Sequence, residues 1–99
     1  MTDTCGFVRV AAGVPRVRVA DPAYNAAEAA ALARAADSAG AHVLVFPECS
    51  LTGYTANDLF QQRTLLDSAL AGLQSLCDET RACNTVLIAG LPLAIDNQL

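Results

Sequence analysis

Short, continuous apolar runs that alternate with helix-like stretches are the feature that most constrains how this 99-residue chain folds. The clearest runs are residues 43–46 and 85–90, and a further β-rich run covers residues 7–12. An apolar run without alternating polar residues is typical of a strand buried on both faces, as in a parallel sheet covered by helices. The sequence therefore predicts an α/β fold in the order β-α-β-α-β, with largely parallel strands and right-handed crossovers.

Between the first two runs, residues 25–39 carry the periodicity of a helix that packs one face on a sheet. Asn25 is suited to cap the free amide groups at the start of this helix, and Glu28 completes a capping box. Gly40 follows at the other end, where a left-handed turn commonly ends a helix. The apolar side of the helix consists largely of alanine, so we expect it to approach the sheet closely.

The second helical stretch covers residues 64–82 and starts with a capping pair, Thr64 and Asp67. Its apolar face is expected to contain Leu66, Leu70, Leu73 and Cys77, with Leu65, Ala69 and Leu76 beside them. Cys77 is accordingly interpreted as a core residue. His42, the single histidine of the chain, comes just before the second strand and is interpreted as a surface or strand-end residue.

Composition excludes several classes of function. The chain carries 6 Lys+Arg, all of them arginines, against 10 Asp+Glu, and its net charge is −4. An acidic chain without cation clusters lacks the charge that binds nucleic acid or an anionic membrane. No basic segment precedes an apolar stretch at the N-terminus, so we expect a cytoplasmic protein whose 4 cysteines are free thiols. The cysteine spacing fits no zinc motif, and no metal site is predicted.

Glu48 is the residue placed best for chemistry, because it follows the apolar run at residues 43–46. Ligands of open α/β sheets bind beside the carboxyl ends of the strands. A carboxylate held there partly out of water would have a raised pKa, which suits a general base. Placement alone is explained more simply by a carboxylate that caps a turn or lies in solvent.

The residues around Glu48 carry a resemblance to a known family. Residues 46–54, with the sequence FPECSLTGY, resemble the segment around the catalytic glutamate of the nitrilase superfamily of carbon–nitrogen hydrolases. The continuation at residues 54–60 and the opening at residues 7–25 are similar to one branch, the amino-terminal glutaminase domain of glutamine-dependent NAD⁺ synthetases. Cys49 is a departure, since members commonly carry a larger aliphatic residue there; this changes the packing and not the assignment.

The resemblance implies a fold and a mechanism. Residues 1–99 correspond to the N-terminal part of one nitrilase-like α-β-β-α sandwich domain. The family uses a Glu–Lys–Cys triad, in which Glu48 matches the general base, and Tyr54 matches a position that contacts the substrate. The chain contains no lysine, and the nucleophilic cysteine of the family lies beyond residue 99. The isolated chain is therefore expected to be inactive and to leave an uncovered sheet face and unpaired strand edges.

The same resemblance implies the substrate and the partners. The domain would hydrolyse glutamine, and the ammonia would pass to a synthetase domain that uses ATP and Mg²⁺ to convert deamido-NAD⁺ to NAD⁺; no cofactor is expected in this chain itself. The rest of the glutaminase domain, the synthetase domain and further copies in a homo-oligomer are the expected partners, without nucleic acid or membrane. Two alternatives remain open: another small-amide hydrolase of the superfamily, and a non-catalytic small α/β module.

Overall fold

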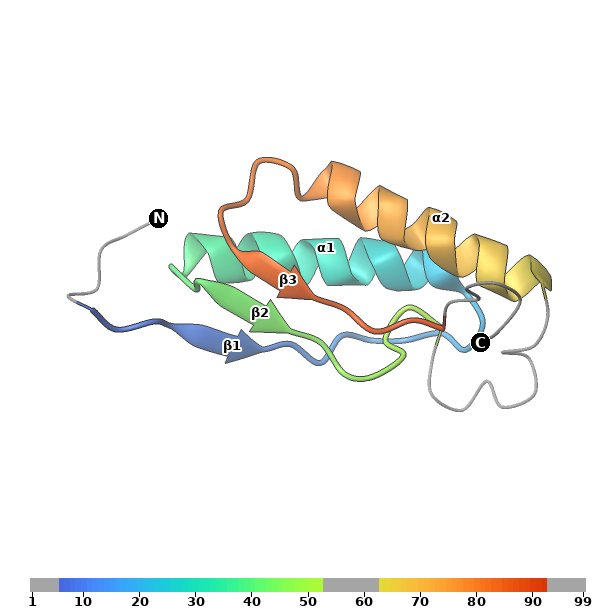
Figure 1. The fold of residues 1–99 in the computed structure, drawn as a ribbon, viewed down its shortest axis with the longest axis horizontal. Coiled ribbons are helices and arrows are strands. Elements are labelled where there is room, and N and C mark those ends of the chain that lie inside the picture. The colour runs from blue at the N-terminus through green and yellow to red at the C-terminus, as the bar shows by residue number, and fades with distance from the viewer. Residues whose placement is uncertain (1–5, 53–62, 93–99) are drawn as a thin grey trace.

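The fold is described by a computed structural model that covers residues 6–52 and 63–92. The elements are β1 (Val10–Ala12), α1 (Pro22–Ser38), β2 (Val43–Val45), α2 (Arg63–Glu79) and β3 (Val86–Ile88). The expected order β-α-β-α-β is thereby confirmed. Both helices lie on one side of the sheet (Figure 1), as two crossovers of the same hand and direction require.

The three strands are parallel and pair in the order β1-β2-β3, so β2 is the central strand. Ala11, Leu44 and Leu87 share one register row, and Leu44 is buried beneath the helices. The residues before and after this row point to the opposite face, because side chains alternate along a strand. The exposed members of those rows are Val10, Ala12, Val45, Val86 and Ile88.

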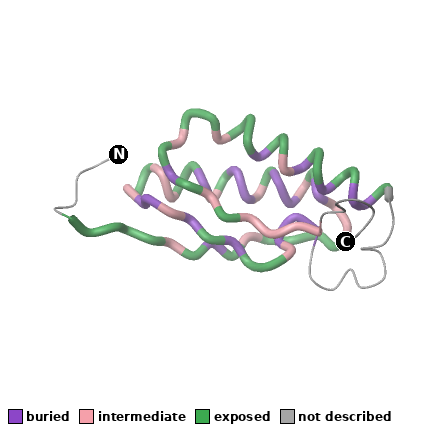
Figure 2. The backbone as a smooth tube through the Cα atoms, viewed as in Figure 1, coloured by how far each residue is buried: buried purple, intermediate pink, exposed green. Residues whose placement is uncertain are grey.

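Burial of the strands on both faces is therefore not found in the described residues, whereas the uncovered sheet face that was expected of this chain is confirmed. One face is covered by α1 and α2, and no described element covers the other, where Val10 is 62% and Ile88 is 52% exposed. Figure 2 shows this as exposed stretches that recur along the strands. The apolar runs indicate side chains that are suited to burial. Burial of both faces also requires a second layer of structure that packs against the uncovered face of the sheet.

α1 begins three residues before the expected start at Asn25. Asp21 is the N-cap, and its Oδ1 accepts a hydrogen bond from the Tyr24 amide at 3.2 Å. Pro22 takes the first helical position, where a missing amide hydrogen costs nothing and the fixed φ suits the helix. The prediction of Asn25 as the cap is wrong, whereas the expected end is confirmed by Gly40, which has a φ of +83°.

Small residues let α1 approach its neighbours closely. Four alanines of this helix are no more than 1% exposed in the core: Ala26, Ala29, Ala30 and Ala33. On α2, a Cβ atom at Gly72 would lie 3.1 Å from the Pro22 carbonyl oxygen, so glycine permits the crossing of the two helices there. The alanine-rich side of α1 is buried in the core, and the close approach found here is to α2, whereas the prediction named the sheet.

α2 ends at Glu79, three residues before the expected end, and the Thr80 hydroxyl donates to the Leu76 carbonyl oxygen at 2.7 Å. The core side of α2 consists of Leu65, Leu66, Ala69, Gly72 and Leu76. Leu70 is 55% exposed and Cys77 is exposed, so the prediction of Cys77 as a core residue is wrong. The close contact of Gly72 with Pro22 turns the core side of α2 toward α1. The neighbouring row, which contains Leu70 and Cys77, consequently faces away from α1.

Candidate active site around Glu48

Glu48 lies at the carboxyl end of the central strand, as its sequence position predicts. β2 ends at Val45, and pairing with the third strand continues for one residue, since the Phe46 amide donates to the Ile88 carbonyl oxygen at 2.9 Å. Phe46 is buried in the core, and the chain then leaves the sheet at Pro47 and Glu48, which are both exposed. The partial burial that was expected for this carboxylate is therefore not found in the described residues.

Residues 48–52 form a tight turn that carries Glu48. The Thr52 amide donates to the Cys49 carbonyl oxygen at 3.2 Å, and Leu51 is 0% exposed. Cys49 has a φ of +55°, in the left-handed region, which costs about 1–2 kcal/mol for a residue other than glycine. Such a conformation persists only where the surroundings hold it.

Neighbouring segments hold the turn through its backbone. The Leu51 amide donates to the Gly90 carbonyl oxygen at 3.2 Å, and the Ala20 amide donates to the Thr52 carbonyl oxygen at 2.7 Å. The Asn25 side chain donates from Nδ2 to the Leu51 carbonyl oxygen at 2.8 Å. Asn25 is thus part of the support of Glu48, a role that its prediction as a helix cap missed.

Two buried hydroxyl groups lie in the same turn. Ser50 is 4% and Thr52 is 0% exposed, and among the described residues neither Oγ of Ser50 nor Oγ1 of Thr52 has a hydrogen-bond partner. A buried polar atom without a partner costs roughly 1–3 kcal/mol. The turn that presents Glu48 therefore carries unsatisfied polar groups as well as an unfavourable backbone conformation.

Cys49, the neighbour of Glu48, is poorly suited to act as a nucleophile. Its burial, and next the negative charge of Glu48, raise the pKa of the Cys49 thiol. Because the thiolate is the nucleophile, a raised pKa lowers reactivity at neutral pH. Cys77 and Cys83 are free thiols on and after α2.

His42 lies at the opposite end of β2 from Glu48. It is 8% exposed, and its Nδ1 accepts a hydrogen bond from the Arg9 amide at 2.8 Å. The His42 amide donates to the Arg9 carbonyl oxygen at 2.7 Å, so this residue joins the starts of β1 and β2. The interpretation of His42 as a strand-end residue is confirmed, and its interpretation as a surface residue is wrong.

Other features of the described residues add no chemistry near Glu48. Tyr54, the predicted substrate contact, lies outside the described residues. Residues 6–52 and 63–92 contain no group of three or more side chains that could hold a metal ion. In the same segments, no helix is long and apolar enough to cross a membrane.

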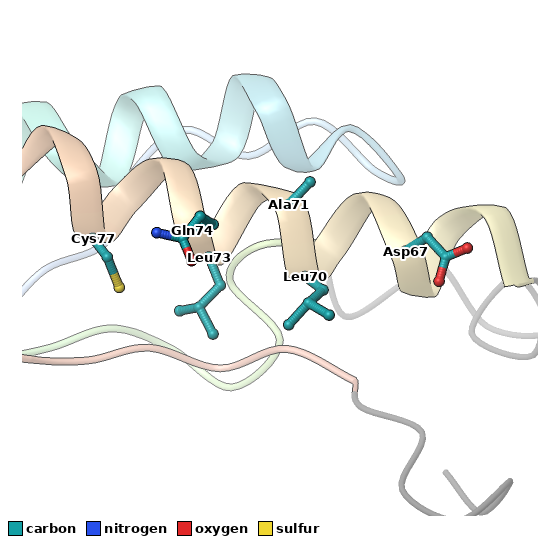
Figure 3. Close-up of a pocket in the computed structure, with 6 residues that line it drawn as sticks. All are labelled: Asp67, Leu70, Ala71, Leu73, Gln74 and Cys77. Atoms are coloured by element: carbon teal, nitrogen blue, oxygen red, sulfur yellow. The ribbon is translucent and has the colours of Figure 1, made fainter.

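A hollow of about 500 Å³ lies along α2 and is largely apolar. Figure 3 shows Leu70 and Leu73 pointing from α2 toward the chain segment that follows β3, and Ala71 pointing away from them. The residues that line the hollow are Asp67, Leu70, Ala71, Leu73, Gln74 and Cys77. None of them belongs to the turn that carries Glu48.

A parallel β-α-β-α-β unit with a carboxylate at the carboxyl end of its central strand is the framework of an α/β enzyme domain. Residues 9–98 match the carbon–nitrogen hydrolase family, and the chain belongs to this family. The nitrilase-like fold that the sequence predicts is thereby confirmed. A solved glutamine-dependent NAD⁺ synthetase from Cytophaga hutchinsonii has the same fold, with a TM-score of 0.81 at 21% identity over 91% of this chain and 15% of that chain.

Two sequence relatives come from mycobacteria. The glutamine-dependent NAD⁺ synthetase of Mycobacterium tuberculosis (strain H37Rv) is 43% identical over 88 residues, which cover 89% of this chain. The enzyme of the same name from Mycobacterium leprae is 38% identical over 88 residues. The chain spans about 13% of the length of these relatives.

Proposed function

We propose that this chain is the N-terminal part of an amidase domain that hydrolyses glutamine, with Glu48 as its general base. The observation that carries the proposal is the place of Glu48, at the carboxyl end of the central strand in a turn held by several segments. Similarity to glutamine-dependent NAD⁺ synthetases over 88 residues, which include Glu48 and its turn, supports glutamine as the amide.

In the proposed reaction the Glu48 carboxylate takes the proton of a cysteine thiol. The thiolate attacks the carboxamide carbon of glutamine, ammonia leaves, and water hydrolyses the resulting glutamyl thioester, while a lysine stabilises the oxyanion. The 99 residues contain no lysine, and the raised pKa of Cys49 makes it a poor nucleophile. We therefore assign the lysine and the cysteine to the rest of a longer polypeptide, and propose Tyr54 as a substrate contact.

We propose that the released ammonia is used for the ATP-dependent conversion of deamido-NAD⁺ to NAD⁺. The relatives' name, glutamine-dependent NAD⁺ synthetase, and the fact that the chain spans about 13% of their length support this proposal. The step is accordingly assigned to a separate synthetase domain. We further propose that the protein assembles into a homo-oligomer and is located in the cytoplasm. Cys49, Cys77 and Cys83 are free thiols, as a reducing compartment requires.

The test is ammonia release from glutamine by the full-length polypeptide that contains this chain. Glu48→Gln keeps the shape of the side chain and removes its basicity, so we expect activity to fall roughly 10²- to 10⁴-fold. Glu79→Gln is the matched control, since Glu79 is a half-exposed residue at the end of α2. Equal activity of the wild type and Glu48→Gln would contradict the role of Glu48, and hydrolysis of other small amides in place of glutamine would contradict the substrate.

The isolated 99-residue chain provides a second comparison. It lacks a lysine, so we expect no ammonia release above that of a Glu48→Gln chain. Release that depends on Glu48 in the isolated chain would show that a nucleophile lies within these residues.

A further inference from the structure

Asn25 is a buried polar residue that the proposed chemistry does not itself use. It lies in the first turn of α1, and only 1% of its surface is exposed. Asp21 already caps the helix, so helix formation does not explain a buried amide at this place. We propose that Asn25 is a positioning residue for Glu48, which it holds at the edge of the sheet through the backbone of the turn at residues 48–52. This inference rests on the proposed role of Glu48.

The Asn25 side chain joins three parts of the chain. Its Nδ2 donates to the carbonyl oxygens of Arg18 and Leu51, each at 2.8 Å. Its Oδ1 accepts from the Arg18 amide, also at 2.8 Å. A side-chain amide has two donor hydrogens and one acceptor oxygen, and all of them are used here. α1, the segment before it and the turn that carries Glu48 are thus connected at one buried point.

The connection reaches Glu48 by two routes. The direct route is the hydrogen bond from Asn25 Nδ2 to the Leu51 carbonyl oxygen. Leu51 lies three residues after Glu48, in the turn that is closed by the hydrogen bond from the Thr52 amide to the Cys49 carbonyl oxygen. The indirect route runs through the segment that Asn25 holds at Arg18, because the Ala20 amide in that segment donates to the Thr52 carbonyl oxygen at 2.7 Å. The two routes fix consecutive carbonyl groups of the turn.

The turn needs this support because of its own conformation. Cys49 is in the left-handed region with a φ of +55°, and the buried hydroxyl groups of Ser50 and Thr52 find no hydrogen-bond partner in residues 6–52 and 63–92. Without the Asn25 amide, the turn can relax toward a more favourable backbone and carry Glu48 with it. Asn25 acts through the backbone, so it is a positioning residue and not a catalytic one.

Two substitutions separate the amide from the space that it fills. Asn25→Asp keeps the size and the acceptor, but places an oxygen opposite the carbonyl oxygens of Arg18 and Leu51, where a donor is required. Asn25→Ala removes the side-chain donors and acceptor. Asn84→Asp is the matched control, because it makes the same chemical change at an exposed asparagine before β3.

The experiment measures kcat and KM for glutamine in the full-length polypeptide. Active sites are first counted by titration with an electrophilic glutamine analogue, so that kcat refers only to folded sites. We expect Asn25→Asp and Asn25→Ala to lower kcat per titrated site roughly 10- to 100-fold, the size of effect that a displaced catalytic group produces. KM is expected to stay unchanged, and Asn84→Asp to behave as the wild type. Fewer titrated sites with an unchanged kcat per site would overturn the inference.

Amide hydrogen exchange tests the same inference without activity. We expect the peptide that contains residues 48–52 to exchange faster in Asn25→Ala than in the wild type or Asn84→Asp. Unchanged exchange would overturn the positioning role. If ammonia release by the wild type does not depend on Glu48, the proposed function is contradicted. In that case hydrogen exchange alone tests whether Asn25 holds the turn at residues 48–52. If Asn25→Ala has no titratable sites, Asn25→Ser, which keeps one hydroxyl, is measured in its place.

Discussion

Gly90 approaches Cys49 so closely that a Cβ atom on Gly90 would lie 2.5 Å from the Cys49 amide nitrogen. The Cα and carbonyl carbon of Glu48 would each lie 3.1 Å from the same point. Gly90 also accepts a hydrogen bond from the Leu51 amide. The turn that carries Glu48 is therefore held by the chain after β3 on one side and by Asn25 on the other.

Gly90→Ala is expected to displace the Glu48 turn. Gly90 is not in the left-handed region, so the strain comes from contact of the new Cβ with the backbone of Cys49 and Glu48. We expect glutaminase activity of the full-length polypeptide to fall roughly 10- to 100-fold, and the free energy of unfolding to fall by about 1–3 kcal/mol. Ammonia release and thermal melting measure the two effects. Ala82→Ser, an exposed change after α2, is the control, and unchanged activity in Gly90→Ala would show that the turn has room to move.

His42 is expected to contribute to stability and not to catalysis. Its Nδ1 accepts from the Arg9 amide at the amino ends of the strands, away from Glu48. His42→Ala leaves this amide without its acceptor, which costs about 1–3 kcal/mol. Asparagine places an Oδ1 acceptor near the position of Nδ1, so we expect His42→Asn to lose less stability than His42→Ala. Chemical denaturation of both variants measures the difference, and equal losses would contradict this role of the hydrogen bond.

The sequence predicts the place of Glu48 because local signals mark it. A continuous apolar run ends at Pro47, and the structure places Glu48 at that end of the strand. Gly40 marks the end of α1 for a similar local reason, since its φ of +83° suits glycine. Both features depend on neighbouring residues in the chain, and such features can be read from one sequence.

Features that depend on distant partners could not be predicted in this way. The Asn25 side chain looks like a helix cap in the sequence, but its contact with Leu51 joins residues 26 positions apart. α2 carries two adjacent apolar rows, and only the close crossing at Gly72 decides that Leu76 is buried and Cys77 is exposed. The exposure of Glu48 likewise depends on the residues that pack around its turn. Its position at the end of a strand does not predict these residues.

The isolated 99-residue chain is expected to associate through the uncovered face of its sheet. Val10, Val86 and Ile88 are each more than half exposed on this face, at 62%, 57% and 52%. Exposed apolar surface of this kind favours association. We expect the chain to bind a dye that reports apolar surface and to scatter light. Val86→Thr with Ile88→Thr keeps β-branched side chains and is expected to reduce both signals, whereas Ser75→Ala on α2 is not. A sharp, reversible melt of a monomeric wild-type chain would contradict this expectation.

The thiol of Cys49 is expected to react with iodoacetamide only at a higher pH than an ordinary cysteine. Burial is the larger cause of its raised pKa, and the negative charge of Glu48 adds to it. Both disfavour the thiolate, so alkylation increases with pH and its midpoint lies above that of a free thiol.

Glu48→Gln removes the charge and leaves the burial. The pKa of Cys49 then decreases part of the way toward its ordinary value, and we expect faster alkylation of Cys49 at a fixed pH near neutrality. Mass spectrometry of peptides measures the rate for Cys49 and, as an internal control, for the exposed Cys77. A Cys49 rate that is the same with and without the Glu48 charge would show that burial alone raises the pKa. A rate that decreases would contradict the sign of the effect, because removal of a nearby negative charge can only favour the thiolate.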